Sequence, residues 1–247
     1  MKTGNTIRMT LALLLFIFST GFANKKDATK DPKAKKILNE FVTATGGEKA
    51  IAGIETLSSK SQLEFVESGL VLKREILETR SKQFFMKVNS PQTGDICRGY
   101  DGKRCWEKRQ AQIREIVDEE KQSFLNTSAF LRFANWEQTL VAYQYAGKTN
   151  VPGQTLHRID VKTIYGAKES WYFNGHDNLL VRMEEPLDLP EGHATATTSF
   201  SDYRDVNGVK LSFAQTIEMP GQNRKITFSE ITANRDIDPN LFSFPEK

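Results

Sequence analysis

The sequence predicts a domain of the α+β class that is mainly antiparallel β, curled into a half-open β-barrel of about eleven strands. Beyond Leu57, apolar and polar residues alternate with a period of two in one short run after another, which is typical of half-buried strands. Turn signals such as Asp101-Gly102 and Asn207-Gly208 separate the runs and favour hairpins between neighbouring strands. The apolar residues include 16 phenylalanines, enough to fill a core.

The N-terminus has the pattern of a secretory signal peptide. Lys2 and Arg8 precede an apolar run over residues 9–18, and small residues follow up to Ala23. We expect residues 1–23 to be a signal peptide cleaved near Ala23 and the protein to be periplasmic. An uncleaved anchor stays open as the alternative, although the uncharged stretch is shorter than the roughly 20 residues of a membrane span. No cysteine lies near the cleavage site, so a lipid-anchored lipoprotein is not expected.

After the signal, a flexible polar tail is expected over residues 24–33, followed by a single domain over 34–247. Residues 34–44 are predicted to form a helix that ends at Gly46, and a shorter helix follows over 48–52. The apolar stripe of the first helix consists of Ile37, Leu38, Phe41 and Val42.

The remaining chain is predicted to be mostly strands, interrupted by one helical segment. The strands are expected at 61–65, 70–78, 84–88, two across 94–108, 112–117, 140–146, 156–165, 169–173, 179–184, 194–204, 209–218 and 225–233. Between residues 118 and 140 the apolar residues recur at intervals of three and four, and acidic residues precede them, which favours a helix. We expect this segment to lie over the concave face of the sheet as a lid.

The two cysteines, Cys97 and Cys105, flank the predicted turn at Asp101-Gly102. A three-residue loop would place them directly opposite each other, and a two-residue loop would place them diagonally. Both geometries allow a disulfide in an oxidising compartment, so Cys97 and Cys105 are disulfide candidates. Their spacing differs from the C-x-x-C of redox-active pairs, and two cysteines are too few for a structural zinc site.

The sequence offers little that could carry catalysis. Its three histidines fall in no metal-binding pattern, and no nucleophile elbow, P-loop or dinucleotide-binding glycine motif occurs. The adjacent carboxylates Glu184 and Glu185 are interpreted as solvated surface. We therefore expect no enzyme activity, no catalytic residue, no metal and no cofactor. The net charge of only +3 argues against a nucleic-acid partner.

The aromatic residues allow two interpretations. They could simply fill the core, or they could line an apolar concave face that holds an acyl chain beneath the lid. A chain of about sixteen carbons would gain on the order of 12 kcal/mol from leaving water. Strand alternation and the lid pattern give these candidate ligand-binding residues: Leu63, Phe65, Leu72, Phe85, Phe124, Phe133 and Trp136.

Five separated segments, in order, resemble the exported family of outer-membrane lipoprotein-sorting proteins with the Lol-type periplasmic carrier fold. Together they span nearly the whole chain after the signal. They are Ile37-Leu38-x-x-Phe41-Val42-x-Ala44-Thr45-Gly46-Gly47; Gly99-Tyr100-Asp101-Gly102-Lys103 with Trp106; Trp171-Tyr172-Phe173; Phe200-Ser201-Asp202-Tyr203-Arg204; and Ile237-Asp238-Pro239-x-Leu241-Phe242.

The resemblance implies a half-open barrel around a hydrophobic cavity covered by helices, with no cofactor and no catalytic residue. It also implies a soluble carrier for lipid or lipoprotein acyl chains, with an inner-membrane donor and an outer-membrane acceptor as partners. The two cysteines depart from the family pattern. The alternative is a non-catalytic periplasmic protein-interaction module of the same fold, whose core is filled by its own side chains.

Overall fold

The computed structural model describes residues 29–90, 94–189 and 192–245. The expected signal peptide and its cleavage site lie outside these residues. The helices are α1 (Pro32–Ala44), α2 (Gly47–Ala52), α3 (Asp118–Thr127), α4 (Trp136–Thr139) and the 3-10 helix η1 (Pro239–Phe242). The strands are β1 (Thr56–Phe65), β2 (Leu70–Thr79), β3 (Phe84–Asn89), β4 (Ile96–Tyr100), β5 (Cys105–Arg109), β6 (Gln112–Ile116), β7 (Leu140–Val151), β8 (Gln154–Thr163), β9 (Lys168–Asn174), β10 (Leu180–Leu189), β11 (Gly192–Val206), β12 (Val209–Glu218) and β13 (Arg224–Ala233).

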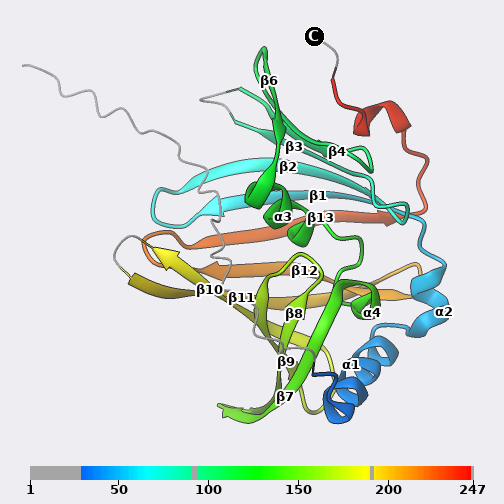
Figure 1. Ribbon diagram of the computed structural model, residues 1–247, viewed down its shortest axis with the longest axis vertical. Coiled ribbons are helices and arrows are strands. Elements are labelled where there is room, and N and C mark those ends of the chain that lie inside the picture. The colour runs from blue at the N-terminus through cyan, green and yellow to red at the C-terminus, as the bar shows by residue number, and fades with distance from the viewer. Residues whose placement is uncertain (1–28, 91–93, 190–191, 246–247) are drawn as a thin grey trace, which may run out of the picture.

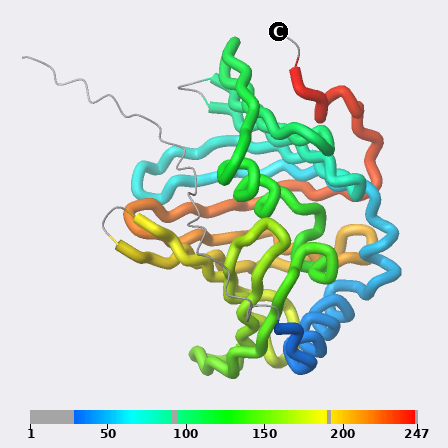
Figure 2. The backbone as a smooth tube through the Cα atoms, in the orientation of Figure 1, coloured from blue at the N-terminus to red at the C-terminus, as the bar shows by residue number. Residues whose placement is uncertain are grey.

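All the strands belong to one antiparallel sheet, shown in Figure 1, in the order β6-β5-β4-β3-β2-β1-β13-β12-β11-β10-β9-β8-β7. The edge strands β6 and β7 do not pair with each other, so the barrel is open. The predicted fold class is thus confirmed. The described residues form 13 strands rather than about eleven, one for each of the thirteen strands expected along the sequence. The helices α1, α3 and α4 lie on one face, which we call the concave face. Figure 2 shows the backbone curving around it.

The helical segment expected over residues 118–140 is broken into two helices. The helix α3 ends at Thr127, and α4 occupies only Trp136–Thr139. Between them the chain turns sharply, and Leu131 has a positive φ of 44°, a backbone conformation that cannot continue a right-handed helix. Because of this break, the covering segment is a helix followed by a loop that can follow the curvature of the sheet. No described helix is long and apolar enough to cross a membrane.

Residues 29–33, expected in the flexible tail, are held against the edge strand β7. Lys30 forms a parallel bridge with Tyr143. The Asp31 carboxylate accepts hydrogen bonds from the backbone nitrogens of Lys33 at 2.7 Å and Tyr145 at 3.0 Å. These bonds hold the pKa of Asp31 below its usual value. Asp31 therefore begins α1 and fastens it to the sheet.

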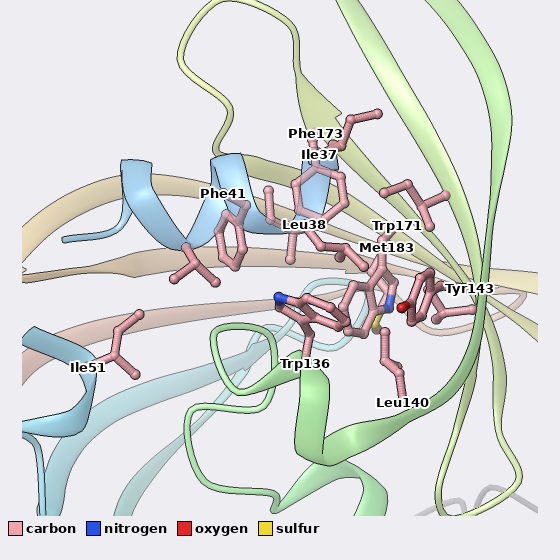
Figure 3. Packing of buried hydrophobic residues seen from close by; sticks show 14 of the residues in the cluster. Ile37, Leu38, Phe41, Ile51, Trp136, Leu140, Tyr143, Trp171, Phe173 and Met183 are labelled. Atoms are coloured by element: carbon pink, nitrogen blue, oxygen red, sulfur yellow. The ribbon is translucent and has the colours of Figure 1, made fainter. Parts of the chain in front are cut away.

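The main core lies between α1 and the strands near β7. Figure 3 shows α1 side chains directed toward Trp136 and Trp171. Phe41 packs on Phe173 with ring centroids 5.3 Å apart, and Trp136 meets Tyr143 edge-on, also at 5.3 Å. Burying each large side chain contributes about 1.5–3 kcal/mol, so this packing fixes α1 and α4 on the sheet.

The glycine predicted to end α1 is needed for a close approach. Gly46 has a φ of 124°, and a Cβ at this position would lie 2.1 Å from the carbonyl oxygen of Gly208. The turn after α1 therefore packs backbone to backbone against the β11–β12 hairpin.

The predicted disulfide is wrong, because the hairpin has a longer loop than expected. Tyr100 pairs with Cys105, whereas Cys97 pairs with Lys108. Side chains alternate between the two faces of a strand, so Cys97, three residues before Tyr100, points to the face opposite Cys105. Both cysteines are free.

Candidate functional site: a covered cavity on the concave face

The concave face contains a cavity of about 440 Å³, a size typical of small-molecule sites. Its floor comes from β1, β2 and β10–β13, and the loop between α3 and α4 covers it. Apolar side chains dominate the lining, among them Leu57, Leu131, Phe133, Phe200, Ile226 and Phe228. The loop and α3 together form the lid (residues 118–135), in the general position predicted from the sequence.

Phe133 fastens the lid to the floor of the sheet. Its ring meets Trp171 edge-on at 5.0 Å and Phe200 edge-on at 5.4 Å. Edge-to-face pairs of this kind contribute about 0.5–1.5 kcal/mol beyond the burial of their area. Phe133 therefore closes one side of the cavity while lining it.

A buried carboxylate, Glu169 on β9, fastens the lid a second time. It accepts from Asn126 Nδ2 at 2.9 Å and from Trp171 Nε1 at 2.7 Å, and it pairs with the Arg132 guanidinium. Asn126 belongs to α3 and Arg132 to the loop. One acceptor on the sheet thus binds both parts of the lid.

Glu185 on β10 lies beside this cluster. It was expected on the solvated surface, but only 7% of it is exposed, because it points to the concave face with Met183. Burial and the negative charge of Glu169 raise the pKa of Glu185, while Arg132 opposes the shift.

A second polar pair, Arg74 and Glu78, lines the part of the cavity formed by β2, away from Glu169 and its contacts with the lid. Burial lowers the pKa of Arg74 to about 10, and burial raises the pKa of Glu78 to about 7. The opposite charge of each residue partly counteracts the shift of the other. Both side chains nevertheless keep some accessible surface, as expected for groups that line a cavity.

The structure places the seven predicted ligand-binding residues in four different surroundings. Phe133 lines the cavity. Trp136 lies in α4 and packs into the main core, whereas Phe124 on α3 meets Phe84 edge-on at 5.3 Å. These two residues hold the covering helices rather than the cavity wall. Contact with a ligand remains a prediction for them.

Three more of the seven, Leu63, Phe65 and Leu72, point to the concave face, as predicted, but form a separate cluster with Val88 and Ile96 beside the cavity. Phe85 was expected on the concave face, which is wrong. Its neighbour Phe84 takes that position, and Phe85 instead packs at 6.2 Å from Trp106 on the opposite face.

Sequence reasoning missed all the charged residues of the site. Arg74 and Glu78 lie two and six residues after Leu72 on β2. Because side chains alternate between the two faces of a strand, this even spacing would have placed them on the same inward face as Leu72. No comparable signal marks Arg132, because the loop that positions it interrupts a helical pattern.

A second depression, of about 490 Å³, lies over β7–β10 and is lined by charged side chains. Its groups bind one another: Arg158 Nε and Ser170 Oγ donate to Asp160 at 2.7 and 2.8 Å. Within the described residues, no group of three or more histidine, cysteine or acidic side chains is arranged to hold a metal ion. The covered cavity is therefore the stronger candidate for a binding site.

No family model and no curated protein matches the sequence. Solved structures do resemble it. A LolA superfamily protein from Nitrosomonas europaea aligns with a TM-score of 0.61 at 11% identity, over 85% of this chain and 97% of the other. A DUF1329 family protein from Desulfovibrio piger gives 0.60 at 13%, over 87% and 98%.

An outer-membrane lipoprotein-sorting protein domain from Vibrio parahaemolyticus gives a TM-score of 0.60 at 11% identity, over 85% of this chain and 96% of the other. At such low identity these similarities establish the fold. They confirm the resemblance inferred from the sequence: the open sheet with its covering helices is similar in architecture to LolA superfamily and lipoprotein-sorting proteins.

Proposed function

We propose that this protein is an exported soluble carrier or binding protein for lipid or lipoprotein acyl chains, of the outer-membrane lipoprotein-sorting type. The observation that carries the proposal is the apolar cavity of about 440 Å³ beneath the lid. The fold shared with a lipoprotein-sorting domain supports it, and the N-terminal signal pattern supports action in a periplasm.

Binding to such a cavity is driven by removing methylene groups from water, at about 0.8 kcal/mol for each. It is reversible and requires neither a cofactor nor a bond-making step. The lid covers the cavity, so cargo enters and leaves when the lid moves, and the contacts of Glu169 and Phe133 set the cost of that movement. A donor at the inner membrane and an acceptor at the outer membrane are the partners that such a carrier requires.

An interaction module with a self-filled core is the alternative of a different class. The cavity disfavours it, because a self-filled core leaves no space of this size between the lid and the sheet. The two functions differ in a direct measurement, since only the carrier takes up an acyl chain.

The test is native mass spectrometry of the mature protein purified gently from its own envelope fraction, with uptake of a fluorescent fatty-acid probe measured in parallel. We expect a stoichiometric lipid or acylated protein that is reduced in Phe133→Ser, which lines the cavity. Phe85→Ser, which removes a phenylalanine from the opposite face, is the matched control and should retain the cargo. A ligand-free mass together with no probe uptake would refute the carrier function.

A further inference from the structure

An unpaired cation and an unpaired acid face the same apolar cavity. Arg74 donates through Nε to Ser61 Oγ at 3.1 Å, and its guanidinium carbon lies 5.7 Å from the centre of the Phe228 ring. Across the described ranges, the terminal nitrogens of Arg74 and the carboxyl group of Glu78 have no hydrogen-bond partner, and no ion pair within 4.0 Å joins the two residues.

These unpaired groups are accessible from the cavity. Neither residue has a side-chain nitrogen or oxygen that is both fully buried and without a hydrogen-bond partner. Both residues belong to the cavity lining. A buried charge without a partner is costly, so a ligand that supplies the missing partner is favoured. The free end of a guanidinium fits a carboxylate, because its parallel N–H groups can bind both oxygens.

We propose that the cavity binds a long-chain carboxylic acid, with its carboxylate held by Arg74 and Glu78 and its chain lying along the apolar wall. This inference rests on the proposed function and narrows it to one ligand class. An ester or amide of the same chain would fill the cavity but leave the charge of Arg74 without a counter-charge.

The pair also gives the binding a defined pH dependence. With a pKa of about 7, Glu78 is readily protonated near neutral pH, whereas Arg74, with a pKa of about 10, stays charged. Protonated Glu78 can donate a hydrogen bond to the ligand carboxylate, whereas ionised Glu78 repels it and competes for Arg74. Affinity should therefore fall as pH rises through about 7.

Other charged groups face the same space. Arg132 from the lid, Glu185 from β10 and Lys210 from β12 line the cavity, and Arg224 on β13 lies over the Phe65 ring at 5.4 Å. Among charged groups, only Arg74 acts on the pKa of Glu78. The pair therefore titrates on its own.

The test compares dodecanoate with methyl dodecanoate, each displacing a fluorescent fatty-acid probe from the full mature protein at pH 6 and pH 8. We expect the acid to bind at least about tenfold more tightly than the ester at pH 6, and to lose about tenfold in affinity by pH 8. The ester should show no such loss.

Variants assign the effect to the pair. Arg74→Met should abolish the preference for the acid over the ester. Glu78→Gln should keep the preference and remove the pH dependence, and Glu75→Gln, on the outward face of the same strand, should change neither. Should Arg74→Met fail to fold, Arg74→Lys keeps the charge without the paired N–H groups and should weaken acid binding severalfold.

The outcomes separate this inference from the proposed function. Equal binding of acid and ester by the wild-type protein would overturn the carboxylate site and leave the acyl-chain carrier standing. Preference for the acid in Arg74→Met would likewise overturn it. Binding of neither compound would refute both proposals.

Discussion

Two arginine–glutamate pairs lie on the concave face, and they differ in what surrounds them. Arg132 and Glu169 form a buried ion pair, and Glu169 also accepts hydrogen bonds from Asn126 and Trp171. Arg74 and Glu78 share only a distant electrostatic interaction and face open space. The difference indicates that buried charge serves structure where it forms an ion pair between the lid and the sheet, and serves binding where it faces the cavity without an ion-pair partner.

The largest test of this comparison is Glu169→Gln. It removes the carboxylate that pairs with Arg132, and breaking a buried ion pair in this way costs about 3–5 kcal/mol. We expect that loss in the free energy of unfolding measured by urea denaturation. Glu75→Gln, an outward-facing control, should stay within about 0.5 kcal/mol of wild type.

The second test is the pH dependence contributed by Glu185, whose pKa is raised from its usual 4.5 by burial and by Glu169. The folded protein therefore holds this proton more tightly than the unfolded chain does. The free energy of unfolding should fall as pH rises from 4.5 through the raised pKa, by on the order of 2 kcal/mol from this group. Glu185→Gln should make the profile less steep over that range, where Glu78 still contributes with the same sign, and an unchanged profile would contradict this account.

A smaller effect is expected for Asn126→Ala, which removes one of the three donors to Glu169. A hydrogen bond to a charged group is worth about 1.5–3 kcal/mol, and we expect a loss near the lower value in chemical denaturation. The double variant with Glu169→Gln should cost less than the sum of the two single variants, because they share a partner. Strict additivity would mean that Asn126 and Glu169 act independently.

The smallest effect on stability should come from Arg74→Met. Within the described part of the chain its one hydrogen bond is to Ser61, and an apolar side chain of similar length suits the lining. We expect a change below about 1 kcal/mol in either direction, measured alongside Glu169→Gln. A loss of unfolding free energy as large as that of Glu169→Gln would show that both pairs contribute equally to stability.

The sequence predicts the sheet well because alternation and turn residues act locally. The stripe of α1, the turn at Gly46 and the strand ranges all follow from neighbouring residues. The site follows less well, because it depends on register and on contacts between distant segments. Phe85 was misplaced because a shift of one residue reverses the face of a strand, and Cys97 was misplaced because the hairpin loop is longer than either predicted loop. Glu185 was misread because nothing adjacent in sequence reveals Arg132 and Glu169 beside it.

The segment that bridges Lys30 to Tyr143 has a consequence for how the protein avoids self-association. An open sheet exposes two rows of unpaired backbone groups, and such rows invite pairing with other chains. At the other edge, β6 is only five residues long and carries the charged side chains of Arg114 and Glu115. Short length and charge both disfavour pairing with another chain. At β7, residues 29–31 occupy part of the row with the protein's own backbone. Deleting these residues would expose the backbone groups of β7 that they now pair with. We therefore expect the deletion to favour intermolecular strand addition and aggregation.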